Sequence, residues 1–195
     1  DAAADVPSAV VNHFGRLDVV VAAAAVVSHG GAHDAGWNVP FEEQDAGLWS
    51  SALDVNVTAT FALVQAAAGP LAVHGVGSIV LVSSQYGFLA PQTAMYEGTG
   101  LQNVAGYAVS KAGLTQLARW LSTTLAPDVR VNSVSPGGIA RDQPDAFVSQ
   151  YEARTPLGRM GKEIDIVGPV LFLASDLSRY VTGHDLVVDG GFSAW

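Results

Sequence analysis

The sequence predicts an α/β fold, a single domain built on a doubly wound parallel sheet. Segments with the pattern of strands alternate with segments with the pattern of helices, the order that produces parallel sheets. Hydrophobic residues make up 49% of the chain and charged residues only 14%. Many elements are therefore expected to be buried on both faces, as the strands of a covered parallel sheet are. The 195 residues suffice for one domain with its own core.

The first third of the chain predicts two helices around one strand. Apolar residues at helical spacing predict a helix over residues 5–15, which Gly15 closes. The continuous apolar run from Leu17 to Val27 predicts a strand. A loop rich in Gly and His follows over residues 28–40, and a long helix is expected from Asp45 to Ala68.

The remaining elements continue the alternation. In order, they are a strand over Ser78–Val82, a long loop over Gln85–Asn103, a helix around Tyr107 that ends near Ala126-Pro127, a strand over Arg130–Val134, a mobile segment over residues 136–156, a helix over Glu163–Ala174 and a strand over Asp185–Val188.

Composition excludes several classes of partner. The net charge of −9 argues against nucleic acid, which needs clustered Lys and Arg, and also disfavours anionic membranes and strongly acidic proteins. The longest apolar run, Val19 to Val27, is shorter than the roughly 20 residues that span a bilayer. No cysteine is present, so disulfide and thiolate chemistry are excluded. Together with the absence of a signal segment, these features favour a cytoplasmic protein.

Tyr107 and Lys111 are the most informative pair of residues. On a helix, a four-residue spacing places both side chains on one face, with Cβ atoms about 5–6 Å apart. A nearby ammonium favours phenolate, so the pair predicts a tyrosine that exchanges a proton nearer neutral pH than usual. Taken alone, the motif is also compatible with an ordinary exposed helix pair.

Four further segments surround this pair in a characteristic order. They are Leu53-Asp-Val-Asn, Gly77-Ser-Ile-Val-Leu-Val-Ser-Ser, Val129-Arg-Val-Asn-Ser-Val-Ser-Pro-Gly-Gly-Ile and Tyr180-Val-Thr-Gly-His-Asp-Leu-Val-Val-Asp-Gly-Gly. The set resembles the short-chain dehydrogenase/reductase family through nearly all 195 residues. The resemblance implies a Rossmann-like domain that interconverts an alcohol and a carbonyl with NAD or NADP.

The resemblance implies four catalytic residues. Tyr107 would be the general acid or base, and Lys111 would lower its pKa and hold the cofactor ribose. Ser84, the second serine of its pair, would hydrogen-bond the substrate oxygen. Asn56 would hold a water that connects the lysine to solvent. The competing structural interpretations are a turn or helix cap for Ser84 and a core hydrogen bond for Asn56.

The cofactor is expected along the carboxyl ends of the strands, where ligands of such sheets bind. The implied cofactor-binding residues are Ala23, Ala24, Ala25, Tyr107, Lys111, Pro136, Gly137, Gly138 and Ile139. The Gly-rich turn with which the family binds pyrophosphate has no counterpart here. Residues 1–195 are therefore expected to form a partial domain that lacks the first strands at its N-terminal side.

The long loop before Tyr107 departs from the family in length and contains Tyr96-Glu97-Gly98-Thr99-Gly100. Together with Ser135-Pro-Gly-Gly-Ile and Tyr151-Glu-Ala-Arg-Thr-Pro-Leu-Gly-Arg-Met, this loop resembles a subgroup of oxidoreductases often associated with bacterial surface-sugar and flagellin-glycan pathways. A sugar-like polyol is therefore the expected small-molecule substrate, with Tyr86, Tyr96 and Glu97 facing it together with Ser84. Arg141 stands where the family usually has threonine.

Two further expectations concern partners and metals. The family implies a homo-oligomer, and more narrowly a tetramer, formed by the helices of Asn56 and Tyr107 and the last strand. The alternative function is a truncated, non-catalytic homologue that serves as an assembly partner. His29 and His33 are four residues apart beside Asp34, but no third ligand is evident and no metal is expected.

Overall fold

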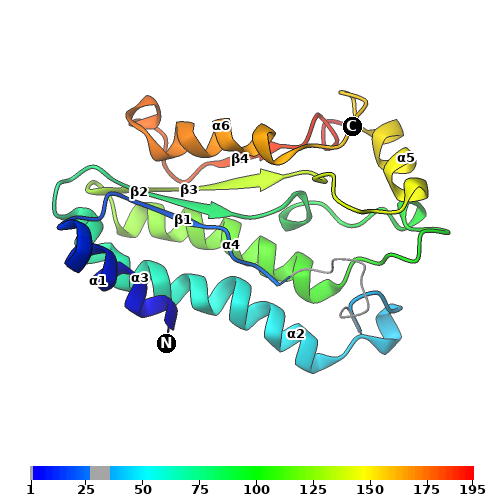
Figure 1. Ribbon diagram of the computed structural model, residues 1–195, viewed down its shortest axis with the longest axis horizontal. Coiled ribbons are helices and arrows are strands. Elements are labelled where there is room, and N and C mark those ends of the chain that lie inside the picture. The colour runs from blue at the N-terminus through cyan, green and yellow to red at the C-terminus, as the bar shows by residue number, and fades with distance from the viewer. Residues whose placement is uncertain (1, 27–35) are drawn as a thin grey trace.

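A four-stranded, fully parallel sheet forms the centre of the protein (Figure 1). The computed structural model describes residues 2–26 and 36–195. The strands are β1 (Val19–Ala22), β2 (Gly77–Val82), β3 (Val129–Pro136) and β4 (Asp185–Val188), and their order in space is their order in the chain. Each connection between neighbouring strands contains a helix, as parallel pairing requires. The predicted α/β fold class is confirmed.

Helices cover both faces of this sheet (Figure 1). One face carries α1 (Ala2–Phe14), α3 (Ala59–Ala72) and α4 (Ala105–Thr124), and the opposite face carries α6 (Glu163–Ala174). Two shorter helices, α2 (Ala46–Leu53) and α5 (Asp145–Arg154), lie toward the end of the molecule at which the strands finish.

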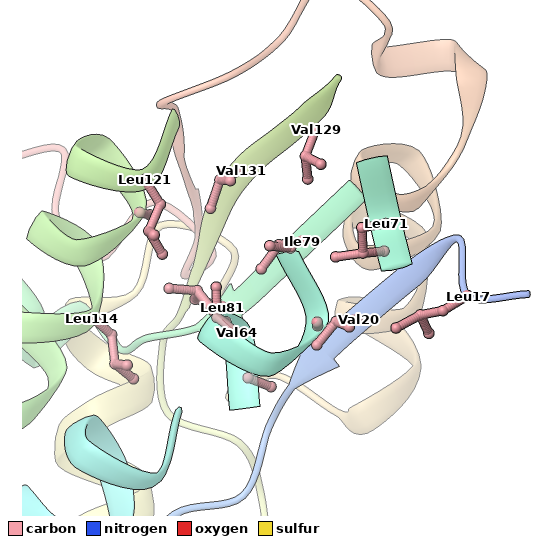
Figure 2. Close-up of a cluster of buried hydrophobic side chains, with 13 residues drawn as sticks. Leu17, Val20, Val64, Leu71, Ile79, Leu81, Leu114, Leu121, Val129 and Val131 are labelled. Carbon is pink, nitrogen blue, oxygen red and sulfur yellow. The ribbon is translucent and has the colours of Figure 1, made fainter. Parts of the chain in front are cut away.

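The main core lies between the sheet and the helices α1, α3 and α4 (Figure 2). Ile79 and Leu81 of β2 meet Val64 of α3 and Leu114 of α4 there, and all four side chains are buried. A smaller cluster on the other face joins β2, β3 and α6, with Val80, Val134 and Leu173 fully enclosed. Because β2 and β3 are buried from both sides, the positions where these two strands end are tightly fixed.

The long helix that precedes β2 contains one widened turn. Residues Asp54–Thr58 are π-helical and connect α2 to α3, so the helix continues to Ala72, beyond the expected Ala68. Asp45 caps its start by accepting hydrogen bonds from the backbone of Gly47 and Leu48. By length and composition alone this helix could cross a membrane, but its Val64 side is buried in the main core.

The segment over residues 136–156 differs most from its prediction. It contains α5, and the Phe147 and Tyr151 side chains of this helix are buried with Met95, Met160 and Phe192. Packing between distant segments therefore orders a region that was predicted to be mobile. The first strand is also shorter than predicted, since β1 pairs with β2 only over Val19–Ala22.

Arg130 ties the end of α6 to the sheet, and its loss is expected to destabilise the fold. Its guanidinium donates to the backbone oxygens of Leu173 and Ser175 and to the hydroxyl of Ser178. These carbonyls lie at the negative end of the helix dipole, and burial lowers the pKa of Arg130. Arg130→Ala should lower the free energy of unfolding by about 2–3 kcal/mol in denaturant titrations, whereas exposed Arg119→Ala should change it little.

Candidate active site

Three of the four predicted catalytic residues, Ser84, Tyr107 and Lys111, lie where the segment after β2 packs against α4. Ser83 and Ser84 directly follow β2, and Tyr107 lies in the first turn of α4. The end of β3 is adjacent, because the backbone N–H of Ser83 donates to the oxygen of Val134 at 2.8 Å. Strand ends from separate parts of the sequence therefore meet at one edge of the sheet, as parallel topology requires.

Tyr107 and Ser84 are in direct contact. A hydrogen bond between the two side chains lowers the pKa of Tyr107, but burial of the phenol has the larger effect and raises it overall. Ser84 also accepts a hydrogen bond from the backbone N–H of Tyr86 at 3.2 Å, which caps a short 3-10 turn over Gln85–Gly87. The structural and the catalytic interpretations of Ser84 are therefore compatible with each other.

Lys111 is buried beneath the ring of Tyr107, with only 3% of the residue exposed. Its Nζ lies 5.7 Å from the ring centroid and donates to the backbone oxygen of Val82 at 2.8 Å. Burial lowers the pKa of Lys111 to about 8. The expected lowering of the tyrosine pKa by Lys111 does not occur in this structure, because the ammonium lies against the ring and burial dominates the phenol.

Ser83 has a structural role distinct from that of Ser84. Its hydroxyl donates to the backbone oxygen of Lys111 at 2.7 Å and accepts from Thr115 at 3.0 Å, so it holds β2 against α4. A Cβ atom on Gly87 would lie 2.7 Å from this hydroxyl, so only glycine allows the turn to approach the helix so closely. Ser84, which is in contact with Tyr107, remains the serine available to a substrate.

Asn56 connects the end of β1 to α4. Its Oδ1 accepts from the backbone N–H of Val26 at 2.7 Å, and its Nδ2 donates to Val26 O and to Ser110 Oγ. Ser110 in turn donates to the backbone oxygen of Tyr107 at 2.8 Å. The side chain thus makes the core hydrogen bonds of the structural interpretation, and the proposed bridging water stays a prediction.

The turn after β3, Pro136 to Ile139, is held by a residue that sequence reasoning missed. The hydroxyl of Tyr151 accepts from the backbone N–H of Gly138 at 2.6 Å and donates to Oε1 of Gln85 at 3.0 Å. A Cβ atom on Gly137 or Gly138 would lie 2.8 Å from atoms of the Tyr151 side chain. The spacing of Phe147 and Tyr151 on one helical face was the available signal.

Tyr86 and Tyr96 are brought together, and Glu97 is not. The two hydroxyls lie 2.5 Å apart, and burial raises the pKa of both phenols. The nearby phenol of Tyr107 raises the pKa of Tyr86 and the pKa of Tyr96 further. Glu97 is exposed, and its backbone oxygen accepts a bond from Gln150 of α5.

The remaining predicted positions are dispersed. Ala23, Ala24 and Ala25 follow β1, where the first two are exposed. Arg141 is exposed and forms an ion pair with Glu163 at the start of α6. The motif of His29, His33 and Asp34 lies outside the described residues. Within residues 2–26 and 36–195, no group of three or more His, Asp or Glu side chains gathers as metal ligands would.

A serine, a tyrosine and a lysine meet here at the carboxyl ends of the parallel strands. Together, such side chains can move a proton to or from an oxygen atom. The sequence matches the family described as enoyl-(acyl carrier protein) reductase over residues 1–193. A short-chain dehydrogenase from Leptospira borgpetersenii, solved with bound NAD+, shares 33% identity at a TM-score of 0.82, over 97% of this chain and 70% of that one. The chain belongs to the short-chain dehydrogenase/reductase family.

Several relatives are named for sugars or polyols, and others are named for cyclic alcohols. The chain is 33% identical to sorbose reductase of Schizosaccharomyces pombe over 91% of its own length, and 34% identical to L-rhamnose 1-dehydrogenase of Azotobacter vinelandii over 94%. It spans 65% of the sorbose reductase and 68% of the rhamnose enzyme. A gluconate 5-dehydrogenase from Burkholderia cenocepacia, at 24% identity and a TM-score of 0.84, shares the fold.

Proposed function

We propose that the intact protein is an NAD(P)-dependent oxidoreductase that interconverts an alcohol and a carbonyl on a neutral, sugar-like polyol. The observation that carries this proposal is the contact between Ser84 and Tyr107 above the buried ammonium of Lys111. A substrate oxygen placed between the two hydroxyls would be held by Ser84 and would exchange its proton with Tyr107.

The residues at this edge of the sheet fit a nicotinamide cofactor. Lys111 has three N–H donors and Val82 takes one, so donors remain for ribose hydroxyls. Gly137 and Gly138 line a cavity of about 190 Å³ at the ends of β3 and β4. When bound, the nicotinamide would supply or accept the hydride. The protein would then position the substrate and move the proton. Ala23, Ala24, Ala25, Pro136 and Ile139 complete the proposed contacts.

The chemistry of the site and the names of several relatives support a neutral, hydroxyl-rich substrate. Sorbose reductase, mannitol dehydrogenase and L-rhamnose dehydrogenase are named for such compounds. In this chain, burial keeps the phenols of Tyr86 and Tyr96 protonated well above neutral pH, so each offers a hydroxyl rather than a charge. A link to surface-sugar or flagellin-glycan chemistry is a narrower form of the same proposal.

Turnover by the intact protein tests this function directly. Neutral ketoses and polyols, each with NAD and with NADP, should change the near-ultraviolet absorbance of the reduced nicotinamide, and one cofactor should be preferred. If no polyol, ketose or simple alcohol is turned over although a dinucleotide binds, the oxidoreductase proposal is wrong. The same result together with a stable hetero-complex would favour the non-catalytic assembly partner.

We also propose that the protein is a cytoplasmic homo-oligomer, a tetramer by the family resemblance. Helix α2 packs on α4, and the continuous helix of Asn56 and helix α4 both expose large apolar side chains. These are Trp49, Val55, Phe61, Val109 and Trp120. A second copy of the chain would remove this surface from water.

A charge at Trp120, one of these exposed apolar positions, is therefore expected to separate the subunits. Trp120 is 58% exposed, so Trp120→Glu removes no core contact but places a carboxylate in an apolar interface. Sedimentation at micromolar concentration should show a smaller species for this variant than for the wild type. Phe14→Glu on α1, where Phe14 is 71% exposed, is the matched control and should leave the oligomer intact. A monomeric wild type would contradict the proposal.

A further inference from the structure

The Tyr151 side chain joins two segments of the candidate site that are distant in the sequence. Its hydroxyl accepts a hydrogen bond from the backbone N–H of Gly138 at 2.6 Å and donates one to Oε1 of Gln85 at 3.0 Å. Gln85 directly follows Ser84, and Gly138 belongs to the turn that ends β3. Tyr151 and Gln85 are each 2% exposed, so both bonds are shielded from water.

The ring of Tyr151 is held on several sides. Phe192 stacks on it with the ring centroids 4.8 Å apart and the planes 16° from parallel, and Phe147 lies 6.0 Å away. On another side the backbone of the turn is so close that a Cβ atom on Gly138 would lie 2.8 Å from ring carbons. A ring packed in this way fixes its hydroxyl in one place, where it reaches the turn and Gln85 together.

Tyr151 does not itself face the cavity proposed for the cofactor. The described lining of this cavity of about 190 Å³ includes Gly137 and Gly138, but neither Tyr151 nor Gln85. A second backbone bond of the turn, from the N–H of Gly137 to the oxygen of Val188, ties it to β4. The hydroxyl of Tyr151 instead ties the turn to the segment after β2. An effect of Tyr151 on a ligand in the cavity must therefore pass through the turn.

We propose that Tyr151 is a positioning residue whose hydroxyl holds the Gly137–Gly138 turn in the shape that binds the cofactor, and that Gln85 keeps this hydroxyl in place. This inference rests on the proposed function and adds a residue that acts on the cofactor without touching it. Without the hydroxyl, the cofactor has to order the turn as it binds, which weakens its affinity. Because Gln85 follows Ser84, the same bonds fix the cofactor turn relative to the serine proposed to hold the substrate.

The test is a titration of the intact protein with NADH and with NADPH, followed by the fluorescence of the bound reduced nicotinamide. Tyr151→Phe keeps the stacked ring and removes one oxygen, and it should weaken the affinity of the preferred dinucleotide about tenfold. Gln85→Leu keeps the bond from Gly138 but removes the anchor of the hydroxyl, and it should weaken the affinity about threefold. The double variant should bind within about twofold of Tyr151→Phe alone, because Gln85 acts through the hydroxyl that is already missing.

Ser178→Ala is the matched control for a general loss of stability. It also removes a fully buried hydroxyl, which donates to the backbone oxygen of Leu173 and accepts from Arg130 at the start of β3, away from the turn that ends this strand. It should lower the free energy of unfolding and leave cofactor affinity within about twofold of the wild type. A role of Tyr151 in stability alone would give Tyr151→Phe this same behaviour.

Unchanged cofactor affinity in folded Tyr151→Phe therefore overturns the inference. Losses of affinity that multiply in the double variant overturn it too, since Gln85 would then act by another route. If Tyr151→Phe does not fold, Gln85→Leu decides alone: weaker binding supports the inference and unchanged binding overturns it. A wild type that binds neither dinucleotide would overturn the proposed function and this inference with it, whereas the other contrary results leave the proposed function standing.

Discussion

Tyr107→Phe in the intact protein should lower turnover by about 10²–10⁴-fold, the usual contribution of a general acid or base, and leave cofactor affinity close to that of the wild type. Removal of the hydroxyl deletes the group that contacts Ser84 and passes a proton to the substrate oxygen in the proposed mechanism. The phenyl ring that covers Lys111 is retained, so the buried ammonium keeps its surroundings.

Steady-state kinetics and cofactor titration measure both quantities. Tyr180→Phe is the matched control, because Tyr180 is fully exposed and the same atom is removed there. It should leave turnover and affinity unchanged. If Tyr107→Phe kept more than a tenth of wild-type turnover, the tyrosine would not be the proton donor.

Lys111→Met is expected to remove activity and, at neutral pH, to stabilise the fold. Burial lowers the pKa of Lys111 from 10.5 to about 8, and each unit of displacement corresponds to about 1.4 kcal/mol. Carrying this charge therefore destabilises the folded state by roughly 3 kcal/mol. Methionine removes that cost, but it also loses the hydrogen bond to Val82, which offsets about 1 kcal/mol of the stability gained. Methionine should raise the free energy of unfolding by about 1–3 kcal/mol at pH 7, with cofactor affinity and turnover reduced.

The pH dependence gives this prediction a sharper signature. Between pH 8 and 10.5 the unfolded chain binds more protons at Lys111 than the folded chain, so the stability of the wild type should rise with pH in that window. Below pH 8, where Lys111 is protonated in both states, the buried charge destabilises the folded state to its full extent. Lys111→Met should show no such rise between about pH 8 and 9, before the tyrosines of the unfolded chain begin to titrate. Denaturant titrations along the pH series measure this, and parallel curves for the two proteins would contradict the assignment.

Elements with strong local signals were predictable from the sequence. The bounds of α6 and β4 agree with their predictions, since the carboxylate of Asp165 accepts from the backbone N–H of Lys162 at the start of the helix and a continuous apolar run, Leu186 to Val188, marks the strand. The spacing of Tyr107 and Lys111 on α4, and the placement of Ser84 at the end of β2, likewise follow from local pattern.

Contacts between distant segments were not predictable. The bond from Tyr151 to Gln85 joins residues 66 positions apart, and the bond from Asn56 to Ser110 joins residues 54 apart. No local pattern encodes such pairings, because they arise from how the elements pack on the sheet. The pKa of Tyr107 was misjudged for the same reason, since it is set by burial rather than by the spacing to Lys111.

The widened turn at Asp54–Thr58 determines which side of the long helix is buried before and after it. The buried residues Ala52, Asn56, Thr60 and Val64 follow at steps of four. In a regular α-helix each such step overshoots a full turn by about 40°, so three steps would rotate Val64 roughly 120° away from Ala52. The π-helical turn winds less per residue and absorbs much of that rotation. One helix thereby faces α4, the Asn56 network and the sheet in succession, and the extra residue that the widened turn accommodates keeps these three contacts on one side of the helix.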